Sequence, residues 1–146
     1  MNRVTDPARV WPIWANSSIN PFVTDDFSTV TPMPEIVAHQ NVVCLMPDAD
    51  DAYFIFVPMR WMMWEVHAAV LTNARTRSVE YGKAAAAWMF GNTPCRTILS
   101  FVPKGNYPAL ALDRAIGFKK VGVVPSCNPK GGTLHDMTLM VLGAGV

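Results

Sequence analysis

The chain has 146 residues and a formal net charge of +1, and 51% of its residues are hydrophobic. That length is typical of one domain around a single core, so we expect one domain over residues 1–146, and the hydrophobic share excludes a disordered chain. The near-neutral charge gives no basic field for nucleic acid, and Pro12 and Pro21 interrupt the uncharged stretch 10–24, which excludes a membrane-spanning helix there.

The first forty residues are rich in Pro, Asn, Ser and Thr, and they predict irregular chain after one short helix or strand over residues 8–14. Trp11 and Trp14 fit one face of a helical turn that packs on the core, and the lip of an aromatic substrate site is the alternative interpretation. The opening residues lack the basic flank and unbroken apolar run of a secretory leader, so we expect a cytoplasmic protein.

Three strands are predicted in the next part of the chain. Residues 41–47 and 52–58 have strand composition and flank an acidic turn, which predicts a hairpin. Residues 61–71 form an apolar run without Gly or Pro, which we interpret as a third strand at the centre of the sheet.

A βαβ unit is predicted over residues 61–102. The alanine-rich stretch 79–90 favours a helix, and Gly91 and Pro94 mark its end. Residues 95–102 then predict a strand, which a right-handed crossover places parallel to the preceding one.

The last third of the chain predicts one more helix and two more strands. Asn106 is a suitable N-cap for a helix over residues 107–116. Strands are expected over 119–124 and 134–142, and the glycine pair 131–132 supplies the turn between them.

This order of elements resembles the second half of a GNAT N-acetyltransferase, over about residues 41–142. Two segments carry the resemblance: the loop Asn73-Ala-Arg-Thr-Arg-Ser78, and Asn106-Tyr-Pro-Ala109 through Gly117-Phe118, which fits the family's N-x-x-A and G-F spacing. The resemblance implies an α/β (α+β) fold, with a mixed, mostly antiparallel sheet, a central βαβ unit and helices on both faces.

The resemblance also implies acetyl coenzyme A (acetyl-CoA) as cofactor. In the family the loop after the third strand follows the pattern Q/R-x-x-G-x-G/A, and its amides bind the pyrophosphate at a helix N-terminus, where the helix dipole and arginine side chains favour an anion. Here Asn73, Thr76 and Ser78 occupy the three patterned positions. A second register uses Gly82 and Ala84, but it starts the loop farther from the strand.

The alternative interpretation of Arg75 and Arg77 is a solvated helix start, because short motifs match easily by chance. Under the family interpretation residues 69–71, at the end of the third strand, contact the pantetheine arm. The predicted cofactor contacts are Ala69, Val70, Leu71, Arg75, Thr76, Arg77, Ser78 and Asn106.

Glu65 and His67 are the candidate catalytic residues. Strand side chains alternate, so both project to one side of the third strand. A primary ammonium has a pKa of ~10.4 and needs a base before it can attack an acyl group, and either residue, or a water held by them, can serve. The alternative is that the two side chains only pair with each other or with neighbours on a partly buried sheet face.

Asp113 is a departure from the resembled family, which often has a tyrosine at this position to protonate the departing thiolate. An ionised carboxylate is a poor proton donor unless burial raises its pKa. The histidines His39 and His135 have no metal-ligand spacing, and the three widely spaced cysteines predict free thiols, so we expect no metal site.

Two classes of function follow. The first is an acetyl-CoA-dependent N-acetyltransferase that acts by direct transfer in a ternary complex, with a small-molecule or protein amine as acceptor. Segments such as Trp64–Leu71 and Trp88–Phe90 also resemble small GNAT-like proteins of phages and prophages, some linked to head assembly. The alternative is therefore a phage virion or assembly protein in the host cytoplasm or virion, with phage structural proteins or a second copy as partners.

Overall fold

The computed structural model describes residues 1–145, and seven strands form one sheet. The strands are β1 (Asn2–Val4), β2 (Val43–Met46), β3 (Ala52–Arg60), β4 (Met63–Val70), β5 (Thr97–Pro103), β6 (Lys119–Lys130) and β7 (Thr133–Gly143). Their order across the sheet is β1-β2-β3-β4-β5-β7-β6, and neighbours are antiparallel except β4 and β5. The predicted mixed sheet with a central third strand is confirmed.

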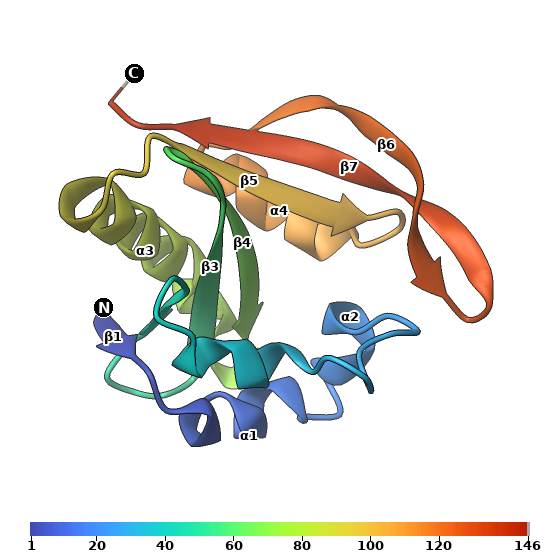
Figure 1. The fold of residues 1–146 in the computed structure, drawn as a ribbon, viewed down its shortest axis with the longest axis horizontal. Coiled ribbons are helices and arrows are strands. Elements are labelled where there is room, and N and C mark those ends of the chain that lie inside the picture. The colour runs from blue at the N-terminus through green and yellow to red at the C-terminus, as the bar shows by residue number, and fades with distance from the viewer. Residues whose placement is uncertain (146) are drawn as a thin grey trace.

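Helices cover both faces of the sheet, as expected (Figure 1). The α-helices are α1 (Trp11–Trp14), α2 (Asn20–Val23), α3 (Ser78–Asn92) and α4 (Tyr107–Ile116), and the 3₁₀ helices are η1 (Pro7–Arg9), η2 (Met33–Ala38) and η3 (Thr72–Arg77). No helix in residues 1–145 has the length and apolar character needed to cross a bilayer.

Alternation along β3 divides the core in two. Phe54 and Phe56 are buried with α3 and α4 on one face of the sheet. Tyr53 and Ile55 are buried on the other face, against the N-terminal segment of residues 1–40. The sheet is therefore the middle layer, and anything projecting from β4 faces either the long helices or the N-terminal segment.

The parallel strands β4 and β5 separate soon after they begin. They pair only between Met63–Glu65 and Thr97–Leu99. Beyond these residues β5 turns away from β4 and continues alongside β7 (Figure 1). The inner edges of both strands are therefore free of strand partners from Val66 and Ser100 onward, within residues 1–145.

Local signals set the ends of α4 and the approach of α3. The Asn106 side chain accepts a hydrogen bond from the amide of Ala109, and Gly117 ends the helix with φ of +120°, so this helix is confirmed residue for residue. A Cβ placed on Gly82 of α3 would lie 2.2 Å from Cδ1 of Ile116. The two helices can pack this closely because residue 82 has no side chain.

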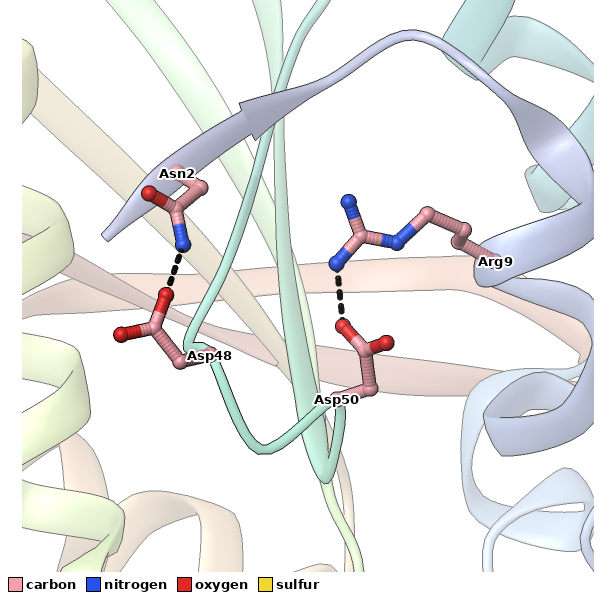
Figure 2. Close-up of polar contacts among 4 residues, drawn as sticks. All are labelled: Asn2, Arg9, Asp48 and Asp50. Carbon is pink, nitrogen blue, oxygen red and sulfur yellow. Dashed lines mark hydrogen bonds and ion pairs between the residues drawn. The ribbon is translucent and has the colours of Figure 1, made fainter.

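The prediction of one short element followed by irregular chain was wrong for part of the N-terminal segment. β1 pairs with β2, and α2 and η2 follow α1. Asn2 donates to Asp48, and Arg9 forms an ion pair with Asp50, so the segment is tied to the β2–β3 turn (Figure 2). These elements are only three to six residues long, too short to produce a readable hydrophobic period.

The last hairpin is longer than predicted, because β6 continues beyond an irregularity and pairs with β7 as far as Lys130. The pairing of Val124 with Met137 resumes only at Asn128 with His135, so the strand bulges between them. The amide of Ser126, in the bulge, donates to the carboxylate of Asp136 at 2.9 Å. The bulge turns Asn128 inward, where it is 9% exposed.

Candidate active site

Two adjoining cavities lie where β4 and β5 separate. The β4–α4 cavity, of about 260 Å³, lies between β4, the start of α3 and the start of α4. The β4–β5 cavity, of about 340 Å³, lies between the two strands, α4 and the N-terminal segment. They share the wall residues Phe22, Val23, Ala68, Asn106, Ala109 and Leu112.

Five of the eight predicted cofactor contacts line the β4–α4 cavity. They are Ala69, Val70, Arg75, Ser78 and Asn106. The side chain of Arg75 makes no hydrogen bond or ion pair with any part of residues 1–145, and it is exposed. The cavity is thus mainly apolar, with one uncommitted guanidinium group at its edge.

Three predicted contacts do not line this cavity. Leu71 packs against the core beside the N-terminal segment, and Thr76 is exposed in η3. The guanidinium of Arg77 lies 3.4 Å from the Glu80 carboxylate and 4.8 Å from the centroid of the Tyr81 ring. Its charge is thereby engaged along α3.

The loop before α3 differs from the open phosphate loop expected from the resemblance. Residues 72–77 form the 3₁₀ helix η3, in which amides bond to carbonyls three residues back. The amide of Ser78 donates to the carbonyl of Arg75, and the Ser78 hydroxyl donates to the same carbonyl at 2.8 Å. The amide of Ser78 is therefore already paired within the chain, although the resemblance implies that amides of this loop bind a pyrophosphate.

Glu65 and His67 meet in the β4–β5 cavity. Nε2 of His67 lies 3.3 Å from Oε1 of Glu65, and their side chains are 33% and 21% exposed respectively. Both lie on the sheet face covered by the N-terminal segment, in the row that continues to the buried Ala69. Burial lowers the pKa of His67 below its usual 6.5, and the Glu65 carboxylate opposes this only in part.

Asp113 reaches the same cavity from α4. It is 8% exposed, and its Oδ2 atom has no hydrogen-bond partner. Burial raises the pKa of its carboxyl group to about 6, against the opposing effect of a hydrogen bond from Ser100. Burial therefore does raise the pKa of this carboxyl, the condition under which it becomes a better proton donor.

Other cavity residues were missed by sequence reasoning. Ser100 and Asn128 are each 9% exposed and line the β4–β5 cavity, and so does the buried Tyr53. Alternation along β5 could have singled out Ser100, whereas Asn128 depends on a bulge with no sequence signature. Within residues 1–145, no three His, Cys, Asp or Glu side chains come close enough together to hold a metal ion.

A mostly antiparallel sheet that opens beside a capped helix is the fold of the GNAT N-acetyltransferases, and solved structures of that class superimpose on this chain. An N-acetyltransferase from Staphylococcus aureus Mu50 has a TM-score of 0.77 at 14% identity, covering 97% of this chain and 95% of the other. No protein-family model and no curated protein matches the sequence.

Two further structures have named acceptors. Spermidine N-acetyltransferase from Vibrio cholerae, in complex with CoA and spermine, has a TM-score of 0.74 at 13% identity, covering 94% and 89% of the two chains. Ribosomal-protein-S5-alanine acetyltransferase from Vibrio fischeri has a TM-score of 0.70 at 12% identity, covering 97% and 87%. At these identities the similarity establishes the fold.

Proposed function

We propose that the chain transfers the acetyl group of acetyl-CoA to a primary amine, by direct attack in a ternary complex. One observation carries the proposal: the cavity that holds Arg75 and the cavity that holds the Glu65–His67 pair share a wall at Ala68 and Asn106. Acetyl-CoA in the first cavity and an amine in the second would meet at this wall. The CoA and spermine in the Vibrio cholerae structure support the same assignment.

The β4–α4 cavity fits the pantetheine arm of the cofactor. Its volume of about 260 Å³ and its apolar lining suit an extended chain, while Arg75 at its edge offers a charge to a phosphate. Ala69 and Val70 would lie along the arm, with Ser78 and Asn106 at the two helix starts. When bound, acetyl-CoA supplies a thioester-activated acetyl group.

The free edge of β4 provides polar groups for the reaction. Within residues 1–145, no strand pairs with β4 on the β5 side after Glu65, so amides on that edge have no ladder partner. Such amides can polarise an acyl oxygen and stabilise the negative charge that develops on it.

The Glu65–His67 pair is suited to remove the proton of the attacking amine. The lowered pKa keeps His67 neutral at neutral pH, so its ring can accept a proton. The Glu65 carboxylate, 3.3 Å away, then stabilises the imidazolium that forms. Proton removal matters because an alkyl ammonium with a pKa of ~10.4 has no lone pair for attack.

Calorimetric titration with acetyl-CoA tests this proposal, and the two arginines provide a matched pair of variants. We expect micromolar binding that weakens about tenfold in Arg75→Ala, because a charge-assisted contact is lost. Arg77→Ala should weaken it far less, since that guanidinium is engaged with Glu80 and Tyr81. No binding at millimolar cofactor would overturn the proposal.

Exposed apolar side chains favour a second candidate, a phage virion or assembly protein that uses this fold as a binding module. Met59, near the end of β3, is 48% exposed, and Trp61 and Met62 in the β3–β4 turn are 92% and 58% exposed. Exposed apolar patches often mark contact surfaces. Loss of a native assembly contact in Trp61→Ser, together with absent cofactor binding, would favour this candidate over the enzyme.

A further inference from the structure

The charged side chains of the β4–β5 cavity are nearly all acidic. They are Asp25, Glu65, His67 and Asp113, and no Lys or Arg among residues 1–145 lines the cavity. His67 adds no positive charge at neutral pH, because burial lowers its pKa. The cavity therefore favours a positively charged occupant.

Asp113 and Asp25 differ in whether water can reach the carboxylate, because Asp25 is exposed and Asp113 is buried. Asp25 is exposed, and its Oδ1 accepts hydrogen bonds from the amide of Phe27 at 2.8 Å and the hydroxyl of Ser28 at 3.3 Å. Asp113 is 8% exposed and keeps one oxygen, Oδ2, without any donor. A buried acceptor of this kind is nearly always paired in folded proteins, so a donor on a bound molecule is expected.

The cavity suits an organic cation of limited size. No three acidic or histidine side chains of residues 1–145 converge as metal ligands, which argues against a metal ion. The volume of about 340 Å³ lies at the low end of small-molecule sites. Phe22, Phe27 and Phe101 also line the cavity and suit methylene groups beside a cation.

Contacts between distant parts of the chain join two segments that line this cavity, residues 22–28 and the strand that contains Asn128. The carboxylate of Asp26 accepts hydrogen bonds from the amides of Gly131 and Gly132, at 2.8 and 2.9 Å. Lys130 donates to the carbonyl of Thr24 at 2.6 Å. We call these three hydrogen bonds the clasp. They join the loop after α2 to the tip of the β6–β7 hairpin (Figure 1).

We infer that the acceptor is a small aliphatic amine with a second cationic group, which Asp113 binds while the reacting amine faces Glu65 and His67. This inference rests on the proposed function for the reacting end. Asp113 comes from α4, on one side of the sheet, and Glu65 projects from β4 toward the other side. Each end of such a molecule therefore has a carboxylate as its partner.

A panel of amines of matched length tests the inference with the unaltered chain. Acetyl transfer from acetyl-CoA is followed with 1,4-diaminobutane, 1-aminobutane and 4-aminobutanoate. We expect kcat/KM for the diamine to exceed that for the neutral-ended amine by about tenfold or more, with the anionic-ended amine accepted least. Equal values for the diamine and 1-aminobutane would overturn the inference.

Asp113→Asn separates cation binding from a general role in catalysis. It should raise KM for the diamine and remove most of the diamine's advantage in kcat/KM over 1-aminobutane, whatever its effect on the rate with either amine. Asp48→Asn, a change of the same charge on the exposed β2–β3 turn, is the control and should keep the preference. An equal loss for all amines in Asp113→Asn would overturn the inference.

Amine binding without turnover distinguishes failure of the inference from failure of the proposed function. Calorimetry with 1,4-diaminobutane, in the presence and absence of CoA, should show binding that Asp113→Asn weakens about tenfold. Such binding without acetylation of any amine would overturn the proposed function but would support a cation-binding site at Asp113. Acetylation of 1-aminobutane, with the diamine bound no more tightly than 1-aminobutane, would support the proposed function and overturn the inference about Asp113.

Discussion

Glu65 and His67 meet because of the two-residue period of a strand. Their shared side of β4 followed from the sequence, and the 3.3 Å contact confirms that they are neighbours. The burial of Asp113 did not follow, because it depends on how α4 lies over the separated strands. A single sequence shows that Asp113 stands where the resembled family often has a tyrosine, but the pKa of Asp113 is set by tertiary packing.

Replacing Glu65 by Gln should slow amine acetylation by ~10²-fold, the lower range for loss of acid–base assistance. Gln keeps the shape of Glu65 but cannot stabilise a protonated His67 as a carboxylate does. Steady-state rates measure the effect, and calorimetry with acetyl-CoA should show unchanged affinity, because the pair lies outside the β4–α4 cavity. Equal rates for variant and parent would remove Glu65 from the mechanism.

Asp113→Asn should stabilise the fold at neutral pH. Burial raises the pKa of Asp113 from 3.8 to about 6 in the folded chain, so its contribution to stability is present below 3.8 and is lost as the pH rises through about 6. The shift corresponds to at most roughly 3 kcal/mol. In urea unfolding, the free energy of unfolding of the variant should increase relative to that of the parent between about pH 4 and about pH 7. A pH-independent difference would contradict this.

At the scale of elements, those with strong local signals were predicted and those set by tertiary contacts were not. The helix at Tyr107–Ile116 has an Asn cap and a Gly stop, and the structure agrees at both ends. The 3₁₀ helix over Thr72–Arg77 and the bulge before Asn128 have no comparable signal. The sequence therefore located the walls of the candidate site better than the conformation of its loops.

Two glycines of α3 allow its packing against α4 to be measured. Nothing lies within 4 Å of a Cβ added at Gly91, so Gly91→Ala should stabilise the chain by up to about 1 kcal/mol through helix propensity. At Gly82 the same methyl displaces Ile116, and overpacking typically costs about 1–3 kcal/mol. Urea unfolding should thus rank Gly82→Ala below both the parent and Gly91→Ala. Equal gains would mean that Ile116 repacks freely.

For the whole molecule, the clasp is the feature least visible in the sequence. It joins residues more than a hundred positions apart, through backbone groups of a glycine turn and a carbonyl of irregular chain. Hydrophobic periodicity says nothing about such contacts. The predicted single domain is compatible with them, since the N-terminal segment covers one sheet face and also reaches the last hairpin.

Asp26→Asn should loosen the clasp. Gly131 and Gly132 donate to different oxygens of Asp26, and Asn replaces one of these oxygens with an amide group that would face a second donor. Amide exchange in the β6–β7 turn, followed by mass spectrometry, should become severalfold faster. Asp25→Asn is the control, because that carboxylate bonds only within its own turn.

Acid should weaken the same hydrogen bonds in the parent chain, because it protonates Asp26. The amides of Gly132 and Gly131 lower the pKa of Asp26 below its usual 3.8, so its contribution is present above that value and is lost as the pH falls through the lower folded value. Exchange that is insensitive to both the substitution and acid would mean that the clasp does not hold the two segments.

The bulge in β6 also gives the chain a selectively reactive thiol. Cys127 lies exposed in it, next to the cavity residue Asn128, whereas Cys44 and Cys95 are buried. Burial raises the pKa of Cys44 to about 12 and also raises that of Cys95, and a thiol reacts as its thiolate. An alkylating fluorophore should therefore label native protein at Cys127 alone, so that its emission reports amine entry without any engineered cysteine.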